Sequence, residues 1–143
     1  MIIYVDSSVL LRVALGQPGR LRSWRQVTRA VSSGLAEVEC LRTLDRLRIE
    51  ESLDDEEVAL RRQSLLGLLD SLTLVDPGRE ILERAAQPLP TVLGTLDAIH
   101  LATALLYREA TRQLLTLATH DLALARAARA HGLPVVGAGE SRS

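Results

Sequence analysis

The sequence predicts an α/β fold in which a parallel sheet of about five strands carries helices on both faces. Short apolar, β-branched runs such as residues 1–5 (MIIYV) and 72–75 (LTLV) are typical of buried parallel strands. Longer segments with apolar residues at helical spacing, such as residues 34–48, lie between these runs. Strands that alternate with helices indicate a parallel sheet, because each parallel connection needs a crossover.

Each element follows from its local pattern. Gly and Pro clusters at residues 16–19 and 76–78 end the segments before them, and residues 88–94 form an irregular loop. Ser52 or Asp54 can begin a helix, because the acids that follow suit its positive end. Strands are expected at residues 1–5, 28–33, 72–75, 114–118 and 133–136. The first helix is expected from a cap at Ser7 or Ser8 through residue 14. Another is expected after Ser52 or Asp54, with a buried stripe made of Leu65, Leu66, Leu68 and Leu69. The remaining helices are expected at residues 20–25, 34–48, 79–86, 97–110 and 121–130.

Length and composition limit the possible functions. A chain of 143 residues is the usual size of one domain, and we expect one domain over residues 1–137 with a flexible tail over residues 138–143. Phe is absent and aromatic residues make up 2%, so the core must be Leu, Val, Ile and Ala. The single cysteine, Cys40, excludes an internal disulfide and a multi-cysteine zinc site. The apolar start is far shorter than the roughly 20 residues of a membrane span, so we expect a cytoplasmic protein without a membrane partner.

All 17 basic residues are arginine. The absence of lysine excludes a P-loop, a Schiff-base lysine and a lysine general base. Net charge is −1, yet residues 10–48 hold eight arginines against three acids, and residues 50–57 hold six acids and no base. The basic segment can hold phosphates while the whole chain stays near neutral. The alternative is that these arginines only solvate helix faces.

Four acidic side chains fall near the expected carboxyl ends of the strands, where parallel sheets bind ligands. Asp6 directly follows the first strand, and Asp121 comes three residues after the fourth. Asp97 opens a helix after the proline-containing loop, and Glu39 lies in the first turns of the helix after the second strand. Carboxylates brought together repel unless a cation neutralises them, and oxygen ligands alone select Mg²⁺ or Mn²⁺. The sequence therefore predicts a divalent-metal site that can activate water against a phosphodiester.

Each of these side chains also has a purely structural interpretation. Asp6, Asp97 and Asp121 can each cap the helix that follows. Glu39 can pair with a neighbouring arginine on the surface, and Glu37 is a rival for its role. The joint placement of the four acids, rather than any one of them, favours the functional interpretation.

Four segments carry a family pattern in the same order and with similar spacing. They are YVDSSVLLR at residues 4–12, VECLRTLDR at 38–46, TLDAIHLATAL at 95–105 and LATHDLALARAARAHGLPVV at 117–136. Together they resemble the PIN domain, and more closely the VapC toxins of bacterial type II toxin–antitoxin pairs. The resemblance covers nearly the whole chain, although residues 50–79 contribute little to it. It implies a PIN-like (Rossmann-like) three-layer fold.

The resemblance implies roles for the acids, residue by residue. Asp6, Glu39 and Asp97 match the positions that bind the main metal ion. Asp121 matches the position that holds metal through water or recruits a second ion. The family register selects Glu39 over Glu37. No acid of the pattern is missing, which implies an active enzyme.

Hydroxyls, histidines and arginines complete the expected site. Ser8 and Thr119 match small hydroxyl positions near the metal, which implies a supporting role. His100 and His120 also match the pattern, and for both we favour the interpretation of a hydrogen-bonded structural histidine. The expected contacts to RNA phosphates come from Arg12, Arg42 and Arg46, which would position RNA without reading its sequence.

The activity implied by the resemblance is that of an Mg²⁺-dependent endoribonuclease, with Mn²⁺ as an alternative metal, that leaves 5′-phosphate ends. The implied partners are RNA as substrate, a small VapB-like antitoxin as inhibitor, and a second copy of the chain in a homodimer.

Other classes of protein also place an aspartate after the first strand. Receiver domains and dehalogenase-type phosphatases do so, but both normally use a lysine that is absent here, and the phosphatase needs a second Asp where this chain has Ser8. A non-enzymatic binding module with structural carboxylates stays open, and it predicts no metal dependence.

Overall fold

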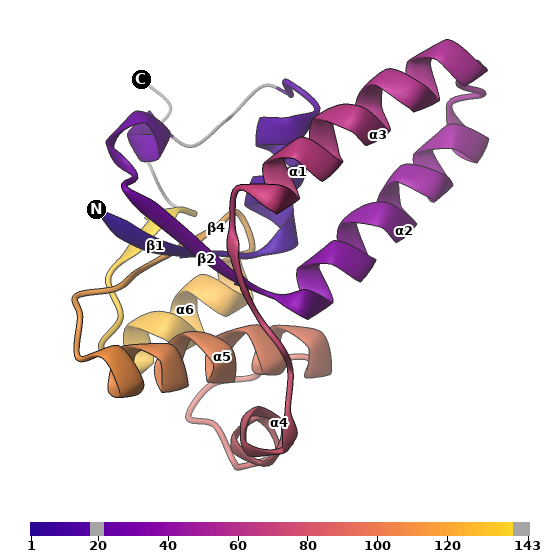
Figure 1. Cartoon of the computed structure of the whole chain (residues 1–143). Helices are drawn as coiled ribbons and strands as arrows, with labels where there is room; N and C mark the ends of the chain where they lie inside the picture. The colour runs from indigo at the N-terminus through magenta and orange to yellow at the C-terminus, as the bar shows by residue number, and fades with distance from the viewer. Residues whose placement is uncertain (18–21, 139–143) are drawn as a thin grey trace.

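The structure, a computed structural model, describes residues 1–17 and 22–138 (Figure 1). Its strands are β1 (Ile2–Val5), β2 (Arg29–Ser33), β3 (Thr73–Val75), β4 (Thr116–Thr119) and β5 (Val135–Gly137). Its helices are α1 (Ser7–Ala14), the short 3₁₀ helix η1 (Arg22–Gln26), α2 (Gly34–Glu50), α3 (Asp55–Asp70), α4 (Arg79–Ala85), α5 (Thr95–Thr111) and α6 (Leu122–Ala130). Every strand begins and ends within two residues of its predicted bounds.

The strands of the described residues form one parallel sheet in the order β3-β2-β1-β4-β5, which confirms the predicted fold class. The chain first adds β2 and β3 on one side of the central strand β1, and then crosses to the other side for β4 and β5. The direction of winding therefore changes between β1 and β4, where Val5 pairs with Ala118. Ligands of open α/β sheets bind at such a switch point, outside the carboxyl ends of the strands.

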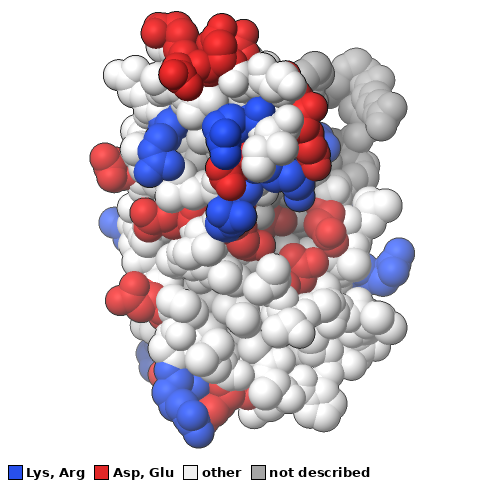
Figure 2. All heavy atoms as spheres, turned by 90° about the vertical axis from the view of Figure 1, so that its right-hand side faces the viewer, with Lys and Arg blue, Asp and Glu red and all other residues white. Residues whose placement is uncertain are grey.

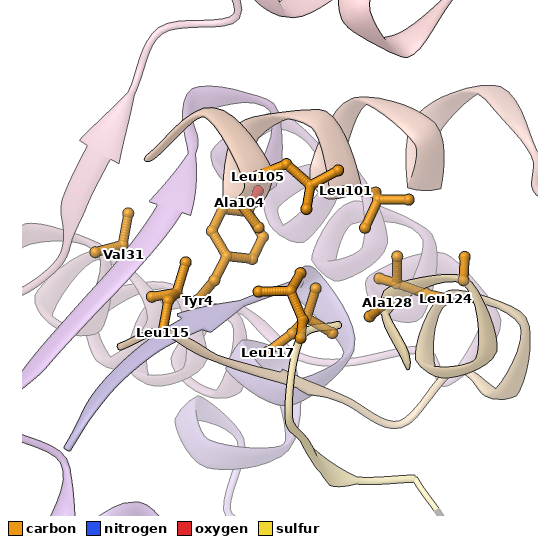
Figure 3. Packing of buried hydrophobic residues seen from close by; sticks show 11 residues of the cluster. Tyr4, Val31, Leu101, Ala104, Leu105, Leu115, Leu117, Leu124 and Ala128 are labelled. Atoms are coloured by element: carbon orange, nitrogen blue, oxygen red, sulfur yellow. The ribbon is translucent and has the colours of Figure 1, made fainter. Parts of the chain in front are cut away.

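Helices cover both faces of the sheet, which gives the three layers. In Figure 1, α1, α2 and α3 lie on one side of the sheet and α4, α5 and α6 on the other. Side chains alternate across β1, so Ile3 and Val5 pack against the first group and Tyr4 packs against the second. Figure 3 shows Tyr4 pointing from the sheet toward α5, near Leu105. The buried residues of both clusters are aliphatic apart from Tyr4 and Cys40, as the absence of Phe predicts.

The cap of α1 differs from the expected one. The sequence predicts Ser7 or Ser8 as the cap, but the cap is Asp6, whose Oδ1 accepts the N–H of Val9 at 3.2 Å. Asp6 is the last residue with extended backbone, and its carboxylate is a stronger acceptor than a hydroxyl. The first acid of the site therefore also begins the first helix.

The first residues of α5 and α3 also test the predicted helix starts. α5 begins at Thr95 after a cap at Gly94, so the prediction that Asp97 opens this helix is wrong by two residues. Asp97 instead lies in the first turn, where its charge suits the positive helix end without a capping bond. At α3 the cap is Asp54 and not Ser52.

Some expectations fall outside the described residues. The expected helix at residues 20–25 does so in part, and its described portion is η1. The expected tail is described only at Ala138, which is buried and donates its N–H to Thr119 O at 2.7 Å. Across residues 1–17 and 22–138, no helix is both long and apolar enough to cross a membrane.

The buried stripe of α3 provides a test of the packing. Leu65 and Leu69 are buried and Leu68 is partly buried, but Leu66 is exposed, so the predicted stripe is wrong at this position. Leu65→Ala should lower the free energy of unfolding by roughly 2–5 kcal/mol, because it leaves a cavity at a side chain that is 0% exposed. Leu60→Ala, on the same helix but 56% exposed, should cost less than about 0.5 kcal/mol. Urea unfolding followed by circular dichroism measures both, and equal losses would contradict this packing.

Candidate active site

Asp6 lies at the carboxyl end of β1 and is 4% exposed. Its Oδ1 accepts the hydroxyl of Ser8 at 2.6 Å and the N–H of Val9, and its Oδ2 accepts the hydroxyl of Thr119. A buried carboxylate needs such donors, because without them its charge would be left unsolvated. These bonds fix Asp6 between the ends of β1 and β4.

The hydroxyls of Ser8 and Thr119 each make a second contact. Ser8 Oγ accepts the N–H of His120, and Thr119 Oγ1 accepts the N–H of Asp121, both at 3.0 Å. Since a backbone N–H occupies a lone pair of each hydroxyl, the hydroxyl proton is left to point at Asp6. The two hydroxyls therefore connect Asp6 to the turn that carries Asp121, and their supporting role near a metal stays a prediction.

Glu39 lies in the second turn of α2 and is partly buried, whereas Glu37 is exposed. Its Oε1 lies 2.5 Å from Nε2 of His100 on α5. The other ring nitrogen, Nδ1, lies 2.6 Å from the hydroxyl of Tyr4. His100 is thus hydrogen-bonded, as expected, and one of its partners is a candidate metal ligand.

Tyr4 is the residue of this site that sequence reasoning missed. The sequence predicts its buried strand, but nothing in strand periodicity indicates which side chain will meet its hydroxyl. A signal was available, because a buried tyrosine in an aliphatic core needs a hydrogen-bond partner.

Asp97 is the acid whose charge responds to all the others. Burial raises the pKa of Asp97 to about 6, and the negative charges of Asp121, Asp6 and Glu39 act in the same direction. His100 acts in the opposite direction and does not cancel them. The fold therefore brings the four predicted acids, from four different parts of the sequence, into one electrostatic environment.

The capping interpretation of the acids is correct for two of them. Asp121 caps α6 through Oδ1, which accepts the N–H of Leu124 at 2.8 Å, and Asp6 caps α1. Asp97 does not cap a helix. Capping uses one of the roughly four lone-pair positions of each carboxylate, so it is compatible with metal binding at a remaining position.

The donors of this site fit a hard divalent cation in their chemistry. Carboxylate oxygens are the ligands that Mg²⁺ and Mn²⁺ prefer, and the negative charges of Asp121, Asp6 and Glu39 add to burial in raising the pKa of Asp97. Within residues 1–17 and 22–138, no three His, Cys, Asp or Glu side chains are grouped closely enough to hold an ion as they stand. Binding would therefore require some of the acidic side chains to move toward one another.

The predicted RNA-binding arginines lie on α1 and α2. Arg12 is partly buried on α1, while Arg42 and Arg46 are exposed on α2 and pair with Asp45 at 3.3 Å and Glu50 at 3.7 Å. Figure 2 views the side toward which β1 and β2 point in Figure 1, and arginine atoms lie there above a hollow bordered by acidic atoms. Basic side chains thus lie beside acidic side chains on this face of the molecule.

The model of the PIN domain matches residues 3–130. The chain therefore belongs to the PIN-domain family. Within that family its sequence is VapC-like: it is 35% identical to Ribonuclease VapC46 of Mycobacterium tuberculosis (strain ATCC 25618 / H37Rv), over 94% of this chain and 95% of that protein. It is 31% identical to Ribonuclease VapC47 of the same species (strain CDC 1551 / Oshkosh), over 98% and 99% of the two chains.

A solved structure supports the same fold. A toxin–antitoxin complex from Klebsiella pneumoniae contains a chain that is similar with a TM-score of 0.59 at 19% identity, over 83% of this chain and 86% of that one.

The raised pKa of Asp97 predicts how stability depends on pH without metal. A carboxyl whose pKa is about 6 when folded and 3.8 as a free group destabilises the fold when ionised. This penalty is fully present above about pH 6 and disappears as the pH falls toward 3.8. Asp97→Asn should therefore raise the melting temperature in EDTA at about pH 7.5, and the gain should vanish near pH 4.

Glu37→Gln is the matched control, because Glu37 is exposed and is not among the charges that act on Asp97. It should give no gain at either pH. A gain for Asp97→Asn that is equally large at both pH values would show that the effect does not come from ionisation of Asp97.

Proposed function

We propose that this protein is the toxin of a type II toxin–antitoxin system and acts in the cytoplasm as a divalent-metal-dependent endoribonuclease. The observation that carries the proposal is that Thr119 links Asp6 and Asp121 at the switch point of the sheet, where the negative charges of these two acids and Glu39 add to burial in raising the pKa of Asp97. Membership of the PIN-domain family, and similarity to two proteins named as ribonucleases, support the same activity.

Asp6, Glu39 and Asp97 are the residues that would hold the main ion, and Asp121 would complete the site through water or recruit a second ion. A bound Mg²⁺ or Mn²⁺ supplies an activated water and neutralises charge on the phosphodiester. Asp6 provides a fixed anchor, since three hydrogen bonds hold its carboxylate. Asp97 carries the destabilised charge, which a cation relieves.

The proposed substrate is the RNA backbone. In the reaction water adds to phosphorus and the bond to the 3′ oxygen breaks, so the products carry a 5′-phosphate and a 3′-hydroxyl. Arg12, Arg42 and Arg46 would hold neighbouring phosphates. The ion pairs of Arg42 and Arg46 are exposed, and such pairs contribute at most about 1 kcal/mol, so a phosphate can replace the acid in each.

Aromatic side chains offer little surface for stacking on RNA bases. Tyr4 is 0% exposed and is enclosed by the core, and Trp24 and Tyr107 pack against the two core clusters. Recognition of unstacked bases normally relies on aromatic side chains. The proposed enzyme therefore recognises RNA mainly through its shape and its phosphates.

A small VapB-like antitoxin and a second copy of this chain are the proposed protein partners. Similarity to the two VapC ribonucleases, and to a chain from the Klebsiella toxin–antitoxin complex, supports the antitoxin. A basic antitoxin segment would suit the acidic site. A groove of about 490 Å³, lined by α4, the loop after it and the start of α5, adds apolar surface for a protein partner, with Val92 at its border 94% exposed.

Purified protein should cleave RNA when Mn²⁺ or Mg²⁺ is present and should stop when EDTA is added. Asp6→Asn and Glu39→Gln should each lower the rate by at least about 100-fold, because a lost ligand removes several kcal/mol of transition-state stabilisation. Incubation with total RNA, followed by mapping of cleaved ends, measures this and identifies the 5′-phosphates. Glu37→Gln, two residues from Glu39 but exposed, should cleave within about twofold of the wild-type rate.

Two results would reject this activity. Cleavage that survives both EDTA and Asp6→Asn would exclude the metal-dependent mechanism. No cleavage of any RNA by metal-loaded protein that is free of antitoxin would exclude the nuclease.

A non-enzymatic module with structural carboxylates makes a different prediction for metal binding. If the acids bind metal, Mn²⁺ at about 100 times its Kd should stabilise the wild-type protein by roughly 2.7 kcal/mol, a rise in melting temperature on the order of 5–10 °C. Asp97→Asn should abolish this rise, and Glu37→Gln should keep it. Differential scanning fluorimetry with and without Mn²⁺ measures the shift, and no rise in the wild-type protein would favour the binding module.

A further inference from the structure

A chain of buried hydrogen bonds leads from the centre of the sheet to one candidate metal ligand. Tyr4 lies on β1, and its hydroxyl is 2.6 Å from Nδ1 of His100, which is 1% exposed on α5. Nε2 of the same ring is 2.5 Å from Oε1 of Glu39 on α2. The rings of Tyr4 and His100 also meet edge to face, with their centroids 5.8 Å apart. One imidazole therefore joins the central strand to helices from both faces of the sheet.

The partners of His100 determine which nitrogen carries the proton. An ionised Glu39 carboxylate only accepts hydrogen bonds, so Nε2 must be the donor to it. In the neutral ring Nδ1 is then an acceptor, and the hydroxyl of Tyr4 donates to it. Glu39 and Tyr4 together therefore favour the tautomer that points an N–H at Glu39.

Glu39 depends on such a restraint more than Asp6 does. Asp6 is fixed by three hydrogen bonds, whereas the longer side chain of Glu39 has one more rotatable bond and more rotamer freedom to lose on binding an ion. Donation from His100 restrains Glu39 before the ion arrives. A ligand that is restrained in advance binds with less loss of entropy.

We propose that His100, oriented by Tyr4, is a positioning residue for Glu39: the imidazole holds one carboxylate oxygen and leaves the other for the divalent ion. His100 is not itself a ligand, because both of its ring nitrogens are engaged in hydrogen bonds. The inference rests on the proposed function, since the role exists only if Glu39 binds metal. Loss of such an outer partner typically weakens metal binding by about 10–100-fold.

Two amide substitutions separate the two ends of the imidazole. Asn at position 100 places its amide near Nδ1, within reach of Tyr4 but not of Glu39. Gln reaches the position of Nε2 and can still donate to Glu39. His100→Asn and His100→Gln both remove the ring, so they share the loss of packing, which thermal melting without metal measures. Calorimetric titration with Mn²⁺ then measures what each does to the metal site.

His100→Asn should weaken Mn²⁺ binding by about 10–100-fold, and His100→Gln should stay within about threefold of wild type. Tyr4→Phe, which removes only the hydroxyl, should give an affinity between those of wild type and His100→Asn, because Nδ1 can then take the proton. Wild-type affinity in His100→Asn would overturn the inference, and so would an equal loss in the Asn and Gln variants. If the wild-type protein bound no Mn²⁺, that result would contradict the proposed function itself, and this inference would fail with it.

Discussion

The carboxylate of Asp6 joins the two halves of the sheet. It accepts hydrogen bonds from the hydroxyl of Ser8, at the start of α1, and from the hydroxyl of Thr119, which is 113 residues away at the end of β4. A buried carboxylate is tolerated only where donors converge on it, and here they converge where the direction of winding changes. The same hydroxyls orient the turn of Asp121. The junction of the halves and the candidate site are therefore one structure.

Gathering the acids has a cost in the metal-free protein. Burial and three neighbouring negative charges raise the pKa of Asp97, so the charge that it carries at neutral pH destabilises the fold. Burial of aliphatic side chains on both faces of the sheet offsets this electrostatic cost. Proteins commonly keep a destabilising arrangement of side chains at a functional site and compensate for it with stabilising interactions in the rest of the fold. A divalent cation held by these carboxylates, as proposed, would lower this electrostatic cost.

The fold was largely predictable because its signals are local. Apolar runs give the strands, and alternation with helices gives the parallel sheet. The four acids could be placed at one edge because carboxyl ends of parallel strands share it. The contact of His100 with Glu39 and Tyr4 could not be predicted, since these residues lie 61 and 96 positions from His100 and periodicity does not reveal which side chains meet across layers. At α1 the preferred caps, Ser7 and Ser8, are wrong and the alternative cap, Asp6, is correct, because the hydroxyl of Ser8 donates to Asp6.

The position of β1 between β2 and β4 has a consequence for the order of events during synthesis. β1 leaves the ribosome before β2 to β5, yet one of its two neighbours, β4, is encoded more than 100 residues later. Such long-range pairing forms late, because the loop between the partners must be closed first. A nascent chain that stops before Thr119 carries Asp6 without the strand whose hydroxyl fixes its carboxylate. The candidate site of this protein can therefore be completed only after β4 has been synthesised.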